Sequence, residues 1–205
     1  MATDRDKVIR TALALLNEVG LEGLTLRRLA TQLGVQAPTL YWHIKSKQEL
    51  LDEMGTAMLR DLVIDAPDTP EAAGDWQEWM TGAASSLRRM LLSYRDGAKV
   101  FSGTYVTDDS VLASMEVPLR VLTEAGFTLP DAVHAWATLY SYVIGFTIEE
   151  QAAATDRRYR PEARARRIDP ERFPLTYRAG EIQFGGDFDD RFARGVQVIL
   201  AGLQR

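Results

Sequence analysis

The chain of 205 residues is 46% hydrophobic, 26% charged and 9% aromatic, which is close to the average of folded soluble proteins. This composition excludes a disordered or collagen-like chain. The absence of cysteine excludes disulfides, thiolate metal sites and a cysteine nucleophile. The N-terminal segment is charged where a signal peptide needs apolar residues, and no apolar run approaches the roughly 18 residues of a membrane span. We therefore expect a cytoplasmic protein without a membrane partner.

Charge is distributed unevenly along the chain. The net charge is −5, yet residues 1–47 hold seven basic and four acidic residues, a local charge of +3. The remainder holds 17 basic and 25 acidic residues, a charge of −8. This asymmetry indicates that the N-terminal part is the one able to approach phosphates.

The first 63 residues predict four helices. An apolar stripe over 4–19, capped by Asp4, ends at Gly20, and Thr25 is placed to cap a second helix that stops at Gly34. A third, barely two turns long, begins near Pro38 and runs to residue 44. Ser46 is placed to cap a fourth over 47–63. This is a helix-turn-helix arrangement.

The third helix has an unusual composition. Leu40 and Ile44 are four residues apart and are expected to face the core, whereas Trp42 is equally compatible with the core and the surface. Thr39, Tyr41 and His43, with Lys47 just after them and Arg27 on the preceding helix, supply groups that contact phosphates and base edges. The segment thus favours DNA binding.

The rest of the chain also predicts helices and no strands, so the fold class is all-α. A linker over 65–70 precedes helices expected at 72–95, 98–103, 109–124, 129–153 and 187–203. Helices 129–153 and 187–203 carry more apolar surface than one chain covers, which predicts a homodimer through a four-helix interface. Arginines in 154–172 alternate with acids, which is typical of a solvated loop rather than a second nucleic-acid patch.

Catalytic and metal-binding patterns are missing from the sequence. His43 and His134 are the only histidines, and neither lies in a catalytic or metal-ligand signature. The pairs Glu149-Glu150 and Asp189-Asp190 are interpreted as ordinary surface carboxylates. We therefore expect neither an enzyme nor a cofactor or metal requirement.

Several long runs resemble the TetR family of regulators, in particular its tetracycline-responsive branch. They are VIRTALALLNEVGLEGL, LTLRRLATQLGVQAPTLYWHIKSKQELLD, LLSYRDGAKVFSGT and IGFTIEEQ. The resemblance implies an all-α homodimeric repressor with a DNA-binding domain (1–46), a connecting helix (47–63) and a ligand-binding and dimerisation domain (64–205). Its partners would be double-stranded operator DNA and a small-molecule effector.

The resemblance also assigns residues to the operator surface. The matching positions are Arg27, Pro38, Thr39, Tyr41, Trp42, His43 and Lys47. Gln36 and Ala37 depart from the pattern, which has an acid followed by a base-reading amide. The operator is therefore expected to differ at the base pairs read from this turn.

The ligand site departs further from the tetracycline-responsive pattern. Phe101 replaces the histidine that binds drug-chelated magnesium, Val63 and Ala83 replace a drug-contacting histidine and asparagine, and Tyr105 begins the pair that replaces Arg-Pro. Of the polar residues linked to the magnesium in that pattern, Glu149 alone is retained. Because a phenyl ring has no lone pair for a metal, the effector is not expected to be a magnesium–tetracycline chelate.

The positions that the resemblance assigns to the effector site are mostly apolar and aromatic. They are Val63, Ala83, Leu87, Phe101, Tyr105, Met115, Val133, Trp136, Tyr140 and Glu149, the last contributed by this chain or by its partner. Such a set favours a flat hydrophobic molecule. The alternative hypothesis is a small-molecule-binding or sequestering protein that no longer binds DNA.

Overall fold

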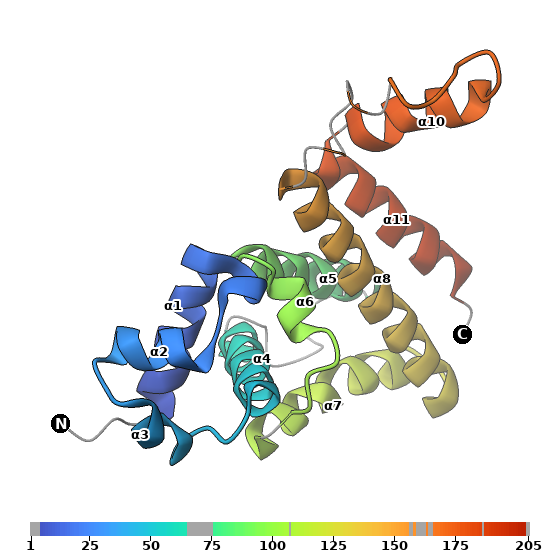
Figure 1. Cartoon of the computed structure of the whole chain (residues 1–205). Helices are drawn as coiled ribbons and strands as arrows, with labels where there is room; N and C mark the ends of the chain where they lie inside the picture. Colours follow the sequence, from blue (N-terminus) through green and yellow to red (C-terminus); the bar gives the residue numbers. More distant parts are fainter. Residues whose placement is uncertain are drawn as a thin grey trace.

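The computed structural model describes residues 5–64, 76–106, 108–155, 158, 163, 166–185 and 187–203. Within these ranges the chain forms helices and no strands (Figure 1). None of these helices is long and apolar enough to cross a membrane. The helices are α1 (Arg5–Gly23), α2 (Leu26–Leu33), α3 (Ala37–Tyr41), α4 (Lys47–Ile64), α5 (Trp76–Leu92), α6 (Gly97–Phe101), α7 (Asp109–Glu124), α8 (Leu129–Thr155), α10 (Pro174–Gly185) and α11 (Phe188–Gly202).

The boundaries of α2 follow the predicted capping chemistry. The Thr25 side chain accepts a hydrogen bond from the Arg28 backbone N–H at 3.2 Å, which satisfies a donor that the first turn leaves open. Gly34 ends the helix in the left-handed conformation, at φ 68°, as glycine readily does. The preceding helix, α1, loses helical geometry at the predicted residue, Gly20, but one further turn continues to Gly23.

Helix α4 joins the N-terminal helices to the rest of the molecule. Its first turn is capped by Ser46, whose Oγ accepts from the Glu49 N–H at 3.0 Å. Leu50, Met54 and Met58 are fully buried. Helix α4 packs against α1 and also against α5, α6 and α7, so it is shared between both halves of the chain.

The C-terminal half is built on α5 and α8. These two helices pack together, α7 packs along α8, and α11 contacts both α5 and α8. Helices α8 and α11 lie side by side and extend away from the N-terminal helices (Figure 1). The predicted helices 109–124 and 187–203 are confirmed to within a residue. The predicted linker at 65–70 lies outside the described residues, as do eight of the 19 residues of the arginine-rich segment 154–172.

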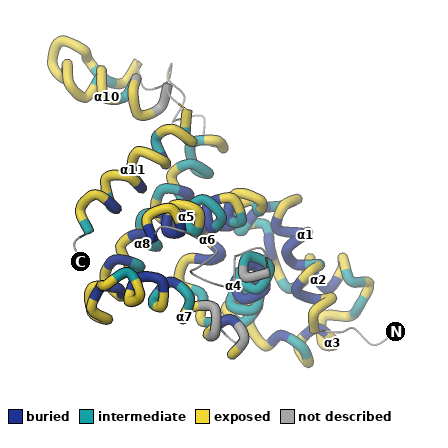
Figure 2. Tube along the Cα trace, turned by 180° about the vertical axis from the view of Figure 1, so that it is seen from behind, coloured by how far each residue is buried: buried dark blue, intermediate teal, exposed yellow. Residues whose placement is uncertain are grey.

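Helix α10 was not predicted from the sequence. It stands apart from the helical body and most of its length is exposed (Figure 2). Leu175 and Ile182 are 77% and 75% exposed. Because its apolar residues form no buried stripe, the periodicity that reveals the other helices is absent here.

An ion cluster joins α5, α8 and α11, with Arg88 and Glu150 nearly buried and Asp189 exposed. The Arg88 guanidinium donates to both carboxylate oxygens of Glu150, at 2.8 and 2.7 Å, and to Asp189 at 2.6 Å. It also lies over the ring of Phe192, 4.9 Å from its centroid. The hydrogen bond to Glu150 helps hold the pKa of Arg88 above its usual value. The interpretation of Glu150 as an ordinary surface carboxylate is therefore wrong, because its side chain is only 13% exposed and pairs with a cation 62 residues away in sequence. The Asp189 side chain is 78% exposed, as that interpretation expected.

Removing the cation should destabilise the fold. We expect Arg88→Ala to lower the free energy of unfolding by about 3 kcal/mol, because it leaves the Glu150 carboxylate partly buried without its partner. Urea denaturation at pH 7 measures this loss. The control is Arg89→Ala, at an exposed neighbouring position of α5, for which we expect a change within about 0.5 kcal/mol. Equal losses in the two variants would contradict the role given to the cluster.

Candidate nucleic-acid interface and effector site

Helix α3 presents nearly all of its polar and aromatic side chains to solvent. Gln36, Ala37, Pro38 and Thr39 are exposed, while His43, beyond the end of the helix, is half-buried. Tyr41 and Trp42 are 53% and 87% exposed. The structure thus brings these predicted operator-facing residues together on one short segment.

Two apolar side chains hold this segment against the protein. Leu40 is 2% exposed and Ile44 is fully buried, as their spacing predicted. The question that the sequence left open for Trp42 is decided in favour of the surface. An indole with so much apolar area in solvent contributes little to folding, and such aromatic groups are typical of recognition surfaces.

The basic residues around α3 have different surroundings. Arg27 is exposed on α2. Lys47 is also exposed, but its Nζ donates to the Leu21 carbonyl oxygen at 3.2 Å. Arg28, which sequence reasoning did not single out, donates in the same way to the Gly23 carbonyl at 3.1 Å. Lys47 and Arg28 therefore neutralise the end of α1 while keeping positive charge near α3.

The burial pattern predicts that the stability of the fold and the recognition of a partner depend on different side chains in and just after α3. We expect Leu40→Ala to lower the free energy of unfolding by about 3 kcal/mol, because it removes buried methyl groups. Trp42→Ala should change it by no more than about 0.5 kcal/mol, because the indole is already in water. Urea denaturation of both variants checks this, and a large loss in Trp42→Ala would show that the indole packs against the fold.

Five of the predicted effector residues lie in or against the C-terminal core. Leu87 and Phe101 are each 4% exposed, and Trp136 and Tyr140 are partly buried against the core. The ring centroids of Phe101 and Tyr140 are 6.2 Å apart, as are those of Trp136 and Trp79. Burial raises the pKa of the Tyr140 phenol, so its hydroxyl stays protonated at neutral pH. Ala83 is half-buried beside this group.

Most of the remaining predicted effector residues are exposed in the single chain. Tyr105, Met115 and Val133 are 77%, 48% and 44% exposed, and Glu149 is also exposed. The side chain of Val63, near the end of α4, lies outside the described part. In a single chain the predicted effector residues therefore divide into a group packed with the core and a group exposed to solvent.

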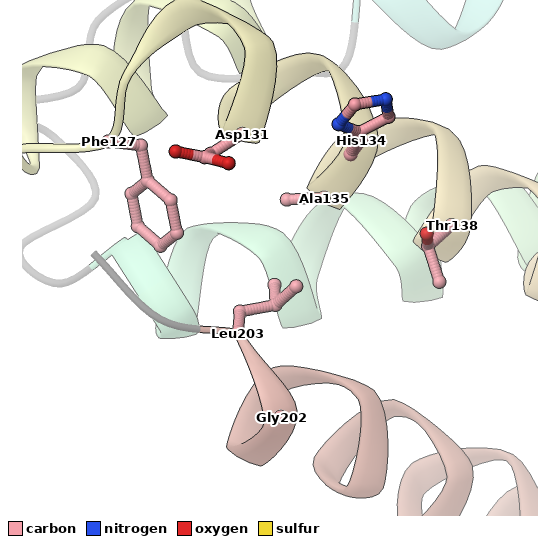
Figure 3. Close-up of a pocket in the computed structure, with 7 residues that line it drawn as sticks. All are labelled: Phe127, Asp131, His134, Ala135, Thr138, Gly202 and Leu203. Carbon is pink, nitrogen blue, oxygen red and sulfur yellow. The ribbon is translucent and has the colours of Figure 1, made fainter.

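A separate open pocket lies between the start of α8 and the end of α11. Its volume is about 270 Å³. Figure 3 shows Phe127, which precedes α8, and Leu203, which follows α11, on two sides of the pocket. Asp131, on α8, lies near Phe127. The other lining residues are His134, Ala135, Thr138 and Gly202. None of them belongs to the predicted effector set.

The segment after α6 contacts α4 through bonds that sequence reasoning did not predict. The Tyr105 backbone N–H donates to Asp52 at 3.2 Å, and Arg60 forms an ion pair with Asp108. A Cβ atom added to Gly55 would lie 2.4 Å from the Thr104 hydroxyl oxygen, so α4 and this segment are in close contact. These partners are about 50 residues apart, and no local pattern links them.

Comparison with known proteins agrees with this architecture. Residues 8–54 match the bacterial regulatory proteins of the tetR family, and residues 66–205 match the tetracyclin repressor-like C-terminal domain. The chain is 40% identical to the tetracycline repressor protein class C of Escherichia coli over 201 residues, covering 98% of this chain and 90% of that protein.

Two solved structures are similar over nearly the whole chain. A possible TetR family transcriptional regulator from Streptomyces coelicolor A3(2) superposes with a TM-score of 0.88 at 36% identity, covering 98% of both chains. ActR from Streptomyces coelicolor, in complex with (S)-DNPA, superposes with a TM-score of 0.81 at 26% identity, covering 99% of this chain and 98% of that one. The protein belongs to the TetR family of bacterial transcriptional regulators.

Proposed function

We propose that this regulator is a dimeric repressor that binds operator DNA through α3 and is released by a small hydrophobic or aromatic effector other than magnesium–tetracycline. The observation that carries the DNA-binding part is the exposed face of α3. Its recognition side chains are in solvent while Leu40 and Ile44 fix the helix in place. A short helix held rigidly with its polar face outward is the geometry that enters a major groove.

Substitutions in α3 and α2 test the DNA contacts. We expect Tyr41→Ala to weaken binding to the intergenic DNA beside the gene more than binding to random DNA, because it removes a side chain facing the bases. Arg27→Ala should weaken both about equally and lower the slope of log affinity against log salt by about one, because one phosphate contact is lost. Gel shifts at several salt concentrations measure both effects.

Arg120→Ala is the matched control, because Arg120 is exposed on α7, away from α3. It should leave DNA affinity unchanged. If the wild-type protein shows no preference for the intergenic DNA and neither variant alters binding, the protein would instead be the small-molecule-binding alternative.

The effector proposal rests on Phe101 and the aromatic groups around it. Phe101 stands where the tetracycline-responsive pattern has a metal-binding histidine, and its ring is buried beside Tyr140. His43 lies just after α3 and His134 lies near the start of α8. Neither histidine belongs to this aromatic group. An apolar wall with one phenol favours a flat aromatic molecule with a hydrogen-bonding edge. The ActR complex with (S)-DNPA indicates that this fold accepts ligands besides tetracyclines.

Tetracycline with magnesium tests this proposal directly. At concentrations that release the class C repressor from its DNA, we expect no release of this protein, because no imidazole is present beside Phe101 to bind the metal. Gel shifts with and without magnesium measure release, with the class C protein as the positive control. Magnesium-dependent release would show that another group of this chain binds the metal.

The dimer proposal rests on the outer faces of α8 and α11. The exposed positions of α8 include Ala137, Ser141 and Gly145, at spacings that place small residues on one face. A Cβ atom added to Gly145 would meet open space. On α11, Val198 is 74% exposed. Two such adjacent helices can pack closely against the same pair from a second copy.

Gly145→Arg tests this interface without disturbing the monomer. The new side chain has room in a single chain, but it would occupy the surface that a second copy needs. We expect sedimentation velocity to show a monomer at micromolar concentration, with binding to a palindromic operator greatly weakened. The control, Gly82→Arg, places arginine in open space on α5 and should remain dimeric. A dimeric Gly145→Arg would refute the proposed interface.

A further inference from the structure

The turn between α5 and α6 has a tightly determined backbone. Asp96 adopts the left-handed conformation at φ 57°, which is unfavourable for most residues other than glycine. A Cβ atom added to the next residue, Gly97, would lie 2.3 Å from the Leu91 carbonyl oxygen. The turn therefore requires glycine at 97, and the groups that bond to it help fix its shape.

Gln151, on α8, holds this turn from the side of the C-terminal domain. Its Nε2 donates to the Leu91 carbonyl at 3.1 Å and to the Tyr94 carbonyl at 2.8 Å. Its Oε1 accepts from the Ala98 N–H at 3.2 Å. One side chain thus bonds to one carbonyl at the end of α5, one just beyond it, and the Ala98 N–H in the first turn of α6, a turn whose N–H groups have no partner within their own helix. The two carbonyls also accept from the backbone N–H groups of Tyr94 and Gly97.

The opposite side of the turn holds the end of α1. The Leu21 N–H donates to the Asp96 carboxylate at 3.0 Å. The Arg95 N–H donates to the Asn17 side chain at 2.8 Å, and its guanidinium donates to the Glu18 carbonyl at 3.1 Å. These contacts surround Gly20, where α1 departs from helical geometry.

The end of α1 is also the point from which the DNA-facing helices are held. Lys47, the first residue of α4, donates to the Leu21 carbonyl, and Arg28, on α2, donates to the Gly23 carbonyl. Leu21 therefore has its N–H bonded to the α5–α6 turn and its carbonyl bonded to α4. A continuous set of hydrogen bonds leads from α8 through the turn to the helices on both sides of α3.

We propose that Gln151 is a positioning residue through which the C-terminal domain sets the orientation of the DNA-binding helices. The proposal rests on the DNA-binding function proposed above. Gln151 fixes the α5–α6 turn. Arg95 and Asp96 of that turn then fix the end of α1. Gln151 itself is part of no proposed DNA or effector contact, so its effect on DNA binding is transmitted through the turn.

Hydrogen–deuterium exchange of the full-length protein tests the structural part without DNA or effector. In Gln151→Ala, we expect amides in 92–99 and also in 17–24 to exchange about tenfold faster, because the three bonds that fix the turn are lost. Amides in 8–15 and in 139–147 should not change. Faster exchange in 92–99 alone would overturn the proposal. A uniform increase throughout α5 and α8 would also overturn it, because it would mean that Gln151 only stabilises the domain.

A second variant changes the hydrogen-bonding chemistry at nearly constant size. Gln151→Glu keeps an acceptor for the Ala98 N–H but places a carboxylate oxygen against the carbonyls of Leu91 and Tyr94. At neutral pH we expect it to loosen 17–24 at least as much as alanine does. Gln183→Ala, at an exposed position of α10, is the control and should exchange like the wild type. A Gln151→Glu protein indistinguishable from the wild type would contradict the proposal.

Binding to the intergenic DNA beside the gene tests the functional part. We expect Gln151→Ala to bind about tenfold more weakly while sedimentation shows an unchanged dimer. Unchanged DNA affinity in a variant whose 17–24 segment has loosened would refute the positioning role. If the wild-type protein itself does not bind this DNA, the proposed function fails, while the exchange experiment still decides whether Gln151 fixes the turn and α1.

Discussion

The architecture depends on the burial of one helix by both halves of the chain. Leu50, Met54 and Met58 of α4 are fully buried, and α4 packs against α1 as well as against α5, α6 and α7. Each of these side chains contributes about 2 kcal/mol on burial. The DNA-facing helices cannot separate from the C-terminal helices without exposing this surface. The ion pair between Arg10 of α1 and Asp61 of α4, at 2.6 Å, is exposed. Such exposed ion pairs orient α4 but contribute little to the free energy of unfolding.

The sequence predicted those features that depend on residues close together in the chain. Thr25 and Gly34 bound α2 as expected, because capping involves groups within a few residues. Leu40 and Ile44 were assigned to the core from their spacing alone, and the structure buries both. Trp42 could not be assigned in this way, because an indole fits either a core or a recognition surface and the short helix has too few residues to define a face.

The part that could not be predicted depends on contacts between distant residues. Glu149, Glu150 and Gln151 are consecutive in the sequence, yet successive residues of a helix point about 100° apart. Glu149 is exposed, Glu150 pairs with Arg88, and Gln151 bonds to the α5–α6 turn. The sequence shows three similar polar residues, and only the positions of α5 and α6 give them three different roles. The family resemblance drew attention to Glu149, which in a single chain has the least contact with the core.

Helix α6 is connected to the N-terminal half at both ends, and the two connections differ. Before α6, Asp96 bonds to Leu21 of α1, and this end is also tied to α8 through Gln151. After α6, the chain bonds to α4 through the Tyr105 N–H and Asp52. Suppose that an effector binds against Phe101, the last residue of α6. The start of α6 is restrained by α8, so a displacement of α6 is transmitted mainly to the segment after α6 and hence to α4. Such a movement of α4 relative to α1 would break the hydrogen bond between Lys47 and the Leu21 carbonyl and would reorient α3, which precedes α4 in the chain. In a two-fold dimer the same movement occurs in each copy, so it changes the separation of the two α3 helices and their fit to successive major grooves.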